Sequence, residues 1–140
     1  MEPLAPAYLS DVASQIGSLS AFLGGFAATF VATLLTIDRA GRLMAATIAL
    51  AVISAVAFII AVTASTMQVA IYHPDGPSFL ADFPAARIRA TMLAAFLTGT
   101  LALLAGLGCS GWIRTRLIGW ITSGVSAFGA VMVVILTLLN

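Results

Sequence analysis

The sequence predicts an all-α integral membrane protein with four transmembrane helices in a small bundle, and its composition and hydropathy pattern lead to this prediction. Hydrophobic residues make up 61% of the 140-residue chain, charged residues make up only 8%, and the mean hydropathy is +1.14. A soluble domain carries about 25% charged residues, so this chain cannot cover a water-soluble surface. The apolar residues form long runs, and we expect one domain over residues 1–140 with spans of about 16–37, 43–72, 90–109 and 117–139.

The first apolar run, from Gly17 to Thr36, contains no charged residue. At 1.5 Å per residue, a helix of this length crosses the ~30 Å hydrocarbon core of a bilayer. Pro6 suits the first turn of a helix, so we expect an interfacial lead-in that continues into this span. Residues 38–42 then form a short polar turn.

The second run, from Leu43 to Tyr72, is longer than a membrane requires. A helix over it measures about 45 Å and must tilt or project beyond the hydrocarbon. Thr66 and Gln68 make its far end more polar, which favours projection into the headgroup region. A turn-rich loop over residues 73–89 leads to the third span, and residues 110–116 connect it to the fourth.

The arginines predict the orientation of the chain in the membrane. The two short loops hold four arginines, whereas the other side of the membrane holds only Arg87 and Arg89. The positive-inside rule therefore places the short loops in the cytoplasm and both termini outside, in the cytoplasmic (inner) membrane of a bacterium. We interpret the loop arginines as topology anchors or as contacts for lipid phosphates. They are Arg39, Arg42, Arg114 and Arg116.

The two halves of the chain share a weak internal similarity. At an offset of 74 residues, AFLGG at 21–25 aligns with AFLTG at 95–99, and Arg42-Leu43 aligns with Arg116-Leu117. This similarity fits a duplicated helical hairpin, which predicts two tandem hairpins in parallel orientation. Chance agreement between two alanine- and leucine-rich segments fits it equally well.

Small residues follow one flank of the first span, and large residues follow the other. One row of small residues, spaced four positions apart, begins at Gly17 and ends at Thr33, and a second such row ends at Thr36. On a helix the two rows lie side by side, so both are on one flank. The bulky flank, which carries Leu19, Phe22, Leu23, Phe26, Phe30 and Leu34, suits contact with lipid. The small flank suits either close packing between helices or a narrow polar path in an oligomer, where threonine oxygens meet a hydrated cation. Its candidate residues are Gly17, Ala21, Gly25, Thr29, Thr33 and Thr36.

The stretch Ser20 to Ala27, SAFLGGFA, resembles the SALLSGFA stretch in the first span of Orai calcium channels. Those channels are built from four-span subunits whose first helix lines the pore. The resemblance implies that Gly25 and Phe26 lie at a gate and that Thr33 occupies the position of the selectivity glutamate. Because Thr33 carries no charge and no basic stretch precedes the span, the resemblance does not extend to calcium selectivity.

The spans contain no ionisable residue in their cores, which disfavours ion-coupled and proton-coupled transport. The sequence holds no catalytic constellation, no phosphate-binding glycine loop and no cluster with metal-ligand spacing, so we expect neither an enzyme nor a cofactor nor a bound metal. His73 and Asp75 form the one candidate metal or pH-sensing pair, and the prolines and glycine around them favour a simple turn. The single Cys109 excludes an internal disulfide.

Two functions remain open from the sequence. The first is a homo-oligomeric ion channel or pore lined by the first helix. The second is a non-catalytic accessory or assembly subunit of a larger membrane complex, in which the small flank is the docking face. Both predict partners in the lipid bilayer, either copies of this chain or other membrane subunits, and neither involves nucleic acid.

Overall fold

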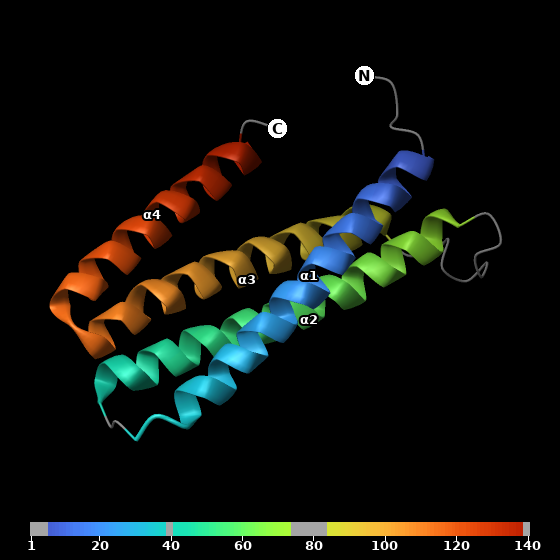
Figure 1. The fold of residues 1–140 in the computed structure, drawn as a ribbon. Helices are drawn as coiled ribbons and strands as arrows, with labels where there is room; N and C mark the ends of the chain where they lie inside the picture. The colour runs from blue at the N-terminus through green and yellow to red at the C-terminus, as the bar shows by residue number, and fades with distance from the viewer. Residues whose placement is uncertain (1–5, 39–40, 74–83, 139–140) are drawn as a thin grey trace.

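The computed structural model describes residues 6–38, 41–73 and 84–138, and its regular structure is entirely helical. The helices are α1 (Pro6–Leu35), α2 (Arg42–Tyr72), α3 (Ala85–Arg114) and α4 (Arg116–Leu138), as Figure 1 shows. Each of these four helices is long and apolar enough to cross a membrane. The predicted fold class, an all-α protein with four membrane spans, is therefore confirmed.

The helices extend beyond several of the predicted spans. α1 begins at Pro6 and continues through the predicted lead-in without a break. α3 runs five residues beyond each limit of the predicted third span, from Ala85 to Arg114. Hydropathy marks the part of a helix that lies in hydrocarbon, whereas arginines are good helix formers and let the helix continue into the headgroup region. The predicted first and third spans are therefore shorter than α1 and α3.

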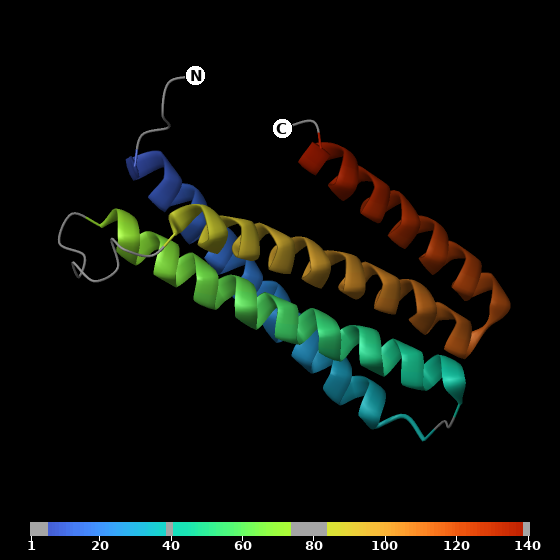
Figure 2. The same cartoon turned by 180° about the vertical axis from the view of Figure 1, so that it is seen from behind.

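The helices form an open series of neighbours in chain order. α2 packs on α1 and on α3, α3 packs on α4, and α1 meets α3 over a small area. Figures 1 and 2 show α1 crossing α2 obliquely and α4 lying along the side of α3 that is turned away from α2. Among the described elements, α4 contacts α3 alone, and α1 contacts α2 and only slightly α3. Both α1 and α4 therefore expose long faces.

The central contact between α2 and its neighbours is built around Phe58, whose side chain is fully buried. Its ring meets the edge of Phe96 on α3, with ring centroids 6.2 Å apart and an interplanar angle of 66°. Glycines on both neighbouring helices make room for it, since a Cβ atom would lie 3.2 Å from Phe58 at Gly24 and 3.0 Å from it at Gly99. The hydroxyl of Ser54 donates a 2.8 Å hydrogen bond to the Gly99 carbonyl oxygen and joins α2 to α3.

The α3–α4 turn is fixed by tryptophans. The indole N–H of Trp112 donates a 2.8 Å hydrogen bond to the hydroxyl of Ser123 on α4. The rings of Trp112 and Trp120 lie 5.6 Å apart, and a Cβ atom at Gly119 would overlap the Trp112 ring. These contacts hold α4 against α3 near their shared turn, while the rest of α4 exposes large apolar residues such as Val125 and Phe128.

The two hairpins, α1–α2 and α3–α4, use their matching residues differently. Phe96 and Gly99 of α3 both pack against Phe58 in the interior. Their counterparts on α1, Phe22 and Gly25, lie on the surface, where Phe22 is 72% exposed. The matching residues therefore have opposite environments in the two hairpins.

Candidate functional site

The face of α1 that contacts α2 repeats every seven residues. Ala13, Ser20, Ala27 and Leu34 are all buried, with exposed fractions between 0 and 4%. A helix turns by about 100° per residue, so residues two positions away from these lie nearly opposite to them. Gly25 and Thr29, on either side of Ala27, therefore point away from α2.

We define the outward face of α1 as the exposed residues that lie two positions from the buried Ser20, Ala27 and Leu34. This face carries small and hydroxyl-bearing side chains together with a single large one, Phe22. No described helix covers it, because α1 contacts only α2 and, slightly, α3. Its residues are Ser18, Phe22, Gly25, Thr29, Ala32 and Thr36.

The predicted small-residue row begins in the interior at Gly17, crosses this outward face at Gly25 and Thr29, and ends beside it at Thr33. Gly17 faces α2, where a Cβ atom would overlap the hydroxyl of Ser65. From Ala21 onward the row is exposed, because residues four apart advance by about 40° around a helix at each step. A Cβ atom at Gly25 would have no neighbour within 4 Å, so a packing role for Gly25 within one chain is wrong. Gly17 and Gly24 are the glycines of α1 that allow close helix contact.

The hydroxyl groups of the row donate to the backbone of their own helix. Thr29 donates to the Gly25 carbonyl and Thr33 to the Thr29 carbonyl, both at 2.9 Å, and Thr36 donates to the Thr33 carbonyl at 2.7 Å. This back-bonding is usual for threonine in apolar surroundings. Each hydroxyl therefore presents oxygen lone pairs outward, which are weak acceptors for water or a cation.

The bulky flank of α1 does not face lipid as a unit, and this part of the prediction is wrong. Leu34 is only 4% exposed and belongs to a core cluster with Met44 and Ala51. Leu23 and Phe30 are half-buried against the core. The reason is that α1 presents both small and large residues to its neighbours, since Leu34 packs with Met44 and Leu23 packs against the cluster that contains Phe58.

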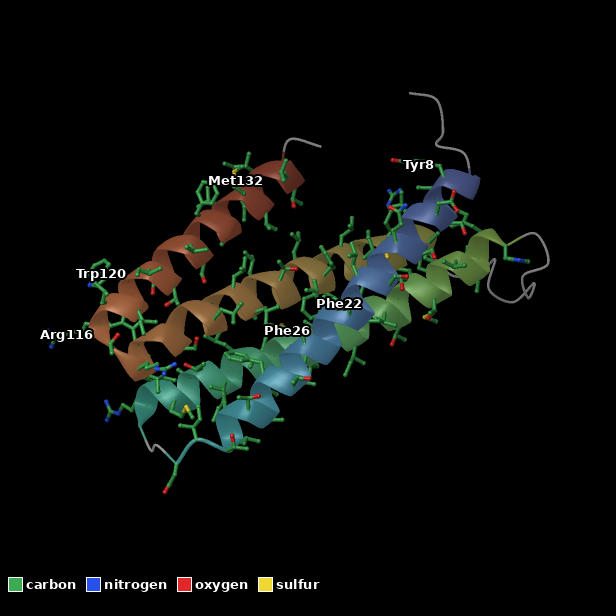
Figure 3. All side chains as sticks on the ribbon, viewed as in Figure 1. Tyr8, Phe22, Phe26, Arg116, Trp120 and Met132 are labelled. Carbon is green, nitrogen blue, oxygen red and sulfur yellow. The ribbon has the colours of Figure 1, made fainter. Side chains whose placement is uncertain are left out.

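Phe26, the predicted gate, lies beside the outward face. It directly precedes the buried Ala27, so its side chain projects about 100° away from the contact with α2, and it is 46% exposed. Phe22 lies two positions after the buried Ser20 and is 72% exposed. Figure 3 labels both rings along α1. Phe22 is thus the most exposed large hydrophobic residue among the described residues of α1.

A groove of about 630 Å³ runs between the first half of α1 and the last half of α2. One wall carries the hydroxyls of Ser14 and Ser18, and the other carries Thr66 and the His73 side chain. A second groove of about 360 Å³ adjoins it through Ala21 and continues along Phe58 and Ile59. Together the two grooves form a surface depression between α1 and α2 that is more polar at one end and apolar at the other.

The described loop arginines lie at one end of the molecule, as the sequence predicts. Arg42 begins α2, and Arg114 and Arg116 flank the α3–α4 turn, which Figure 2 shows beside the start of α2. Arg87 and Arg89 lie at the opposite end, near the beginning of α3. All five side chains are exposed, whereas Arg39 and Asp75 lie outside the described residues. Within the described ranges, no three residues among His, Cys, Asp and Glu gather as a metal site would require.

One polar residue near the far end of α2 is buried. Gln68 belongs to the segment that we expect to reach the headgroup region, and within it the Gln68 side chain is 1% exposed and lies inside the helix contacts. Among the residues that the structure describes, its Oε1 atom has no hydrogen-bond partner. Ser65 is buried as well, whereas Thr63 and Thr66 are exposed. Some polar side chains at this end of α2 therefore lie in the interior and others on the surface. A helical-period count from Ala61 and Ala64 would have placed Gln68 on the buried face.

Comparisons with protein-family models, with curated proteins and with solved structures found no match to this chain.

Proposed function

We propose that this chain forms a homo-oligomeric pore in which α1 faces the symmetry axis. The observation that supports this proposal is the outward face of α1, a small and hydroxyl-bearing surface that the chain itself leaves uncovered. Lipid gains more dispersion contact from leucine-like side chains than from such a surface, whereas a water-filled path accepts the hydroxyl oxygens. Several copies arranged around α1 would give these residues an aqueous environment.

The chemistry of this face favours weak selectivity. Thr29 and Thr36 offer uncharged hydroxyl oxygens, whose protons are already donated to carbonyl groups of the helix backbone. Rings of such groups hold water and hydrated cations without binding a divalent ion tightly. Phe22 would then form the apolar constriction of the path, a role that the resemblance to Orai channels gives to Phe26.

The orientation follows from the charges at the two ends of the molecule. Arg42, Arg114 and Arg116 lie at the end that holds the short turns. We place that end in the cytoplasm and both termini outside, in a bacterial inner membrane, because short cytoplasmic loops are enriched in arginine and lysine.

A second function is supported by α4, which contacts α3 alone among the described helices. Its opposite face carries Leu117, Trp120, Val125 and Phe128, each more than two-thirds exposed. This face suits a helix of a different membrane subunit, and the chain would then be a non-catalytic accessory or assembly subunit.

Native mass spectrometry of the protein purified in mild detergent separates the two functions. A ring of one subunit, together with ionic current after reconstitution into planar bilayers, supports the pore. Copurification of other membrane subunits in fixed ratio, without current from the isolated chain, contradicts the pore and supports the accessory role.

A further inference from the structure

A groove of about 420 Å³ lies between the ends of α1 and α3 that are nearest to the short turns. From α1 it is lined by Phe30, Thr33 and Leu34, from the turn after α1 by Ile37, and from α3 by Ser110, Ile113 and Arg114. Four of these side chains are apolar, and three of them, Phe30, Leu34 and Ile37, line one wall over about 10 Å, while Ile113 faces them from α3. The remaining polar groups are two hydroxyls and one guanidinium.

Arg114 adds a positively charged group to the lining of this groove. Its side chain is exposed and forms no hydrogen bond or ion pair with the described residues. The guanidinium group carries five N–H donors in a geometry that matches a phosphate. It lies in the last turn of α3, where a membrane-spanning helix enters the headgroup layer.

The hydroxyl groups contribute less to the recognition of an anion. Ser110 donates to the Leu107 carbonyl at 2.8 Å, and Thr33 donates to the Thr29 carbonyl at 2.9 Å. Both protons are therefore already engaged, and the guanidinium is the donor available to a phosphate. Asp38 follows Ile37 and adds one negative charge near the groove, whereas Arg42 and Arg116 add positive charge at the same end.

From this arrangement we infer that the groove binds a phospholipid, whose phosphate meets Arg114 and whose acyl chain lies along Phe30, Leu34 and Ile113. Charge complementarity selects the phosphate, and the apolar wall selects a phosphate that carries an acyl chain over free inorganic phosphate. The groove lies to the side of the outward face of α1, so this inference does not depend on the proposed pore.

Native mass spectrometry with dioleoyl phosphatidylglycerol as the probe tests the inference, with Arg114→Gln and Arg116→Gln as a matched pair. Arg116 has the same charge and flanks the same turn but does not line the groove. We expect Arg114→Gln to weaken lipid binding at least about tenfold, as loss of a charged hydrogen-bonding group does. Arg116→Gln should retain binding, and unchanged thermal unfolding in detergent would show that both variants fold.

Two further arms identify what is recognised. Dioleoylglycerol, which has the chains without the phosphate, and inorganic phosphate, which has no chains, should both bind much more weakly than the phospholipid. Ile37→Ser should also weaken phospholipid binding, because Ile37 lines the apolar wall and is 41% exposed, so its side chain is accessible to an acyl chain. Equal loss in both arginine variants, or inorganic phosphate binding as well as the lipid does, would overturn the inference.

Discussion

Gly99 on α3 lies so close to Phe58 on α2 that a Cβ atom at Gly99 would stand 3.0 Å from the Phe58 ring. Phe58 is fully buried, so its ring has little freedom to move aside. Gly99→Val should therefore lower the free energy of unfolding by about 1–3 kcal/mol, the usual cost of overpacking a core. Thermal unfolding in detergent measures this loss.

Gly25→Val is the matched control for this change, because both glycines are helical and both variants pay the same helix propensity. A Cβ atom at Gly25 meets no atom within 4 Å, so its variant should unfold near the wild-type temperature. Equal destabilisation by the two substitutions would show that Phe58 does not require Gly99.

Ser54 provides the hydrogen bond that joins α2 to α3, and its removal should have a smaller effect. Ser54→Ala deletes the 2.8 Å bond to the Gly99 carbonyl in a buried site. We expect a loss of about 0.5–1.5 kcal/mol in the free energy of unfolding, since interhelical hydrogen bonds in membranes are modest. Ser18→Ala, which removes an exposed bond of 3.0 Å within α1, should change it by less than about 0.5 kcal/mol. A larger effect at Ser18 than at Ser54 would contradict this account.

Gln68 should be replaceable by an apolar residue without loss of stability. Its buried Oε1 atom finds no hydrogen-bond partner in the described part of the chain, and an unsatisfied buried polar group costs about 1–3 kcal/mol. Gln68→Leu should therefore leave the unfolding temperature unchanged or raise it. Gln15→Leu, on the exposed side of α1, is the control and should have little effect. A marked loss of stability in Gln68→Leu alone would mean that the amide has a partner in the folded protein.

Hydropathy was sufficient to predict the helices, but the helix contacts depend on a different property of the sequence. The four runs were long and nearly free of charge, so their helical state in a membrane follows from the need to satisfy backbone hydrogen bonds. Which face of a helix is buried depends on the seven-residue contact pattern of two crossing helices. The four-residue row that begins at Gly17 departs from that pattern, and it therefore leaves the interior by Ala21.

The bulky residues of α1 illustrate why faces are harder to predict than spans. Lipid and a protein interior are both apolar, so leucine and phenylalanine give no signal that distinguishes them. Leu34 is consequently buried while Leu19 is 54% exposed, although both belong to the flank that was expected to face lipid. The groove beside Arg114 could not be predicted from the sequence either, because it forms only where the ends of α1 and α3 lie side by side.

The proposed orientation can be tested by labelling with a membrane-impermeant maleimide in a Cys109→Ser background. Ala86 and Thr115 are both exposed and lie at opposite ends of α3. With the termini outside, Ala86→Cys should be labelled in intact cells, and Thr115→Cys should be labelled only after the membrane is permeabilised. The reverse pattern would invert the orientation and place the short turns outside.

The outward face of α1 makes a specific prediction about conduction. Thr29 lies on this face, whereas Thr33 lies to its side and lines the groove that contains Arg114. If α1 lines a pore, Thr29→Glu should place a ring of carboxylates at the axis and shift permeation toward cations, with block by divalent ions. Thr33→Glu should have a weaker effect, because its carboxylate lies off the axis near a guanidinium. Planar-bilayer recordings of both variants beside the wild type measure the difference.

Phe22 and Phe26 provide the second comparison in the same recordings. Phe22 is 72% exposed and projects directly away from α2, whereas Phe26 is 46% exposed and lies beside the outward face. Phe22→Ala should raise the current more than Phe26→Ala, because a wider and less apolar constriction is easier to wet. A larger increase in Phe26→Ala would mean that α1 is rotated about its axis relative to the outward face defined here. Absence of current from the wild type and from all four variants would contradict the pore and favour the accessory-subunit role.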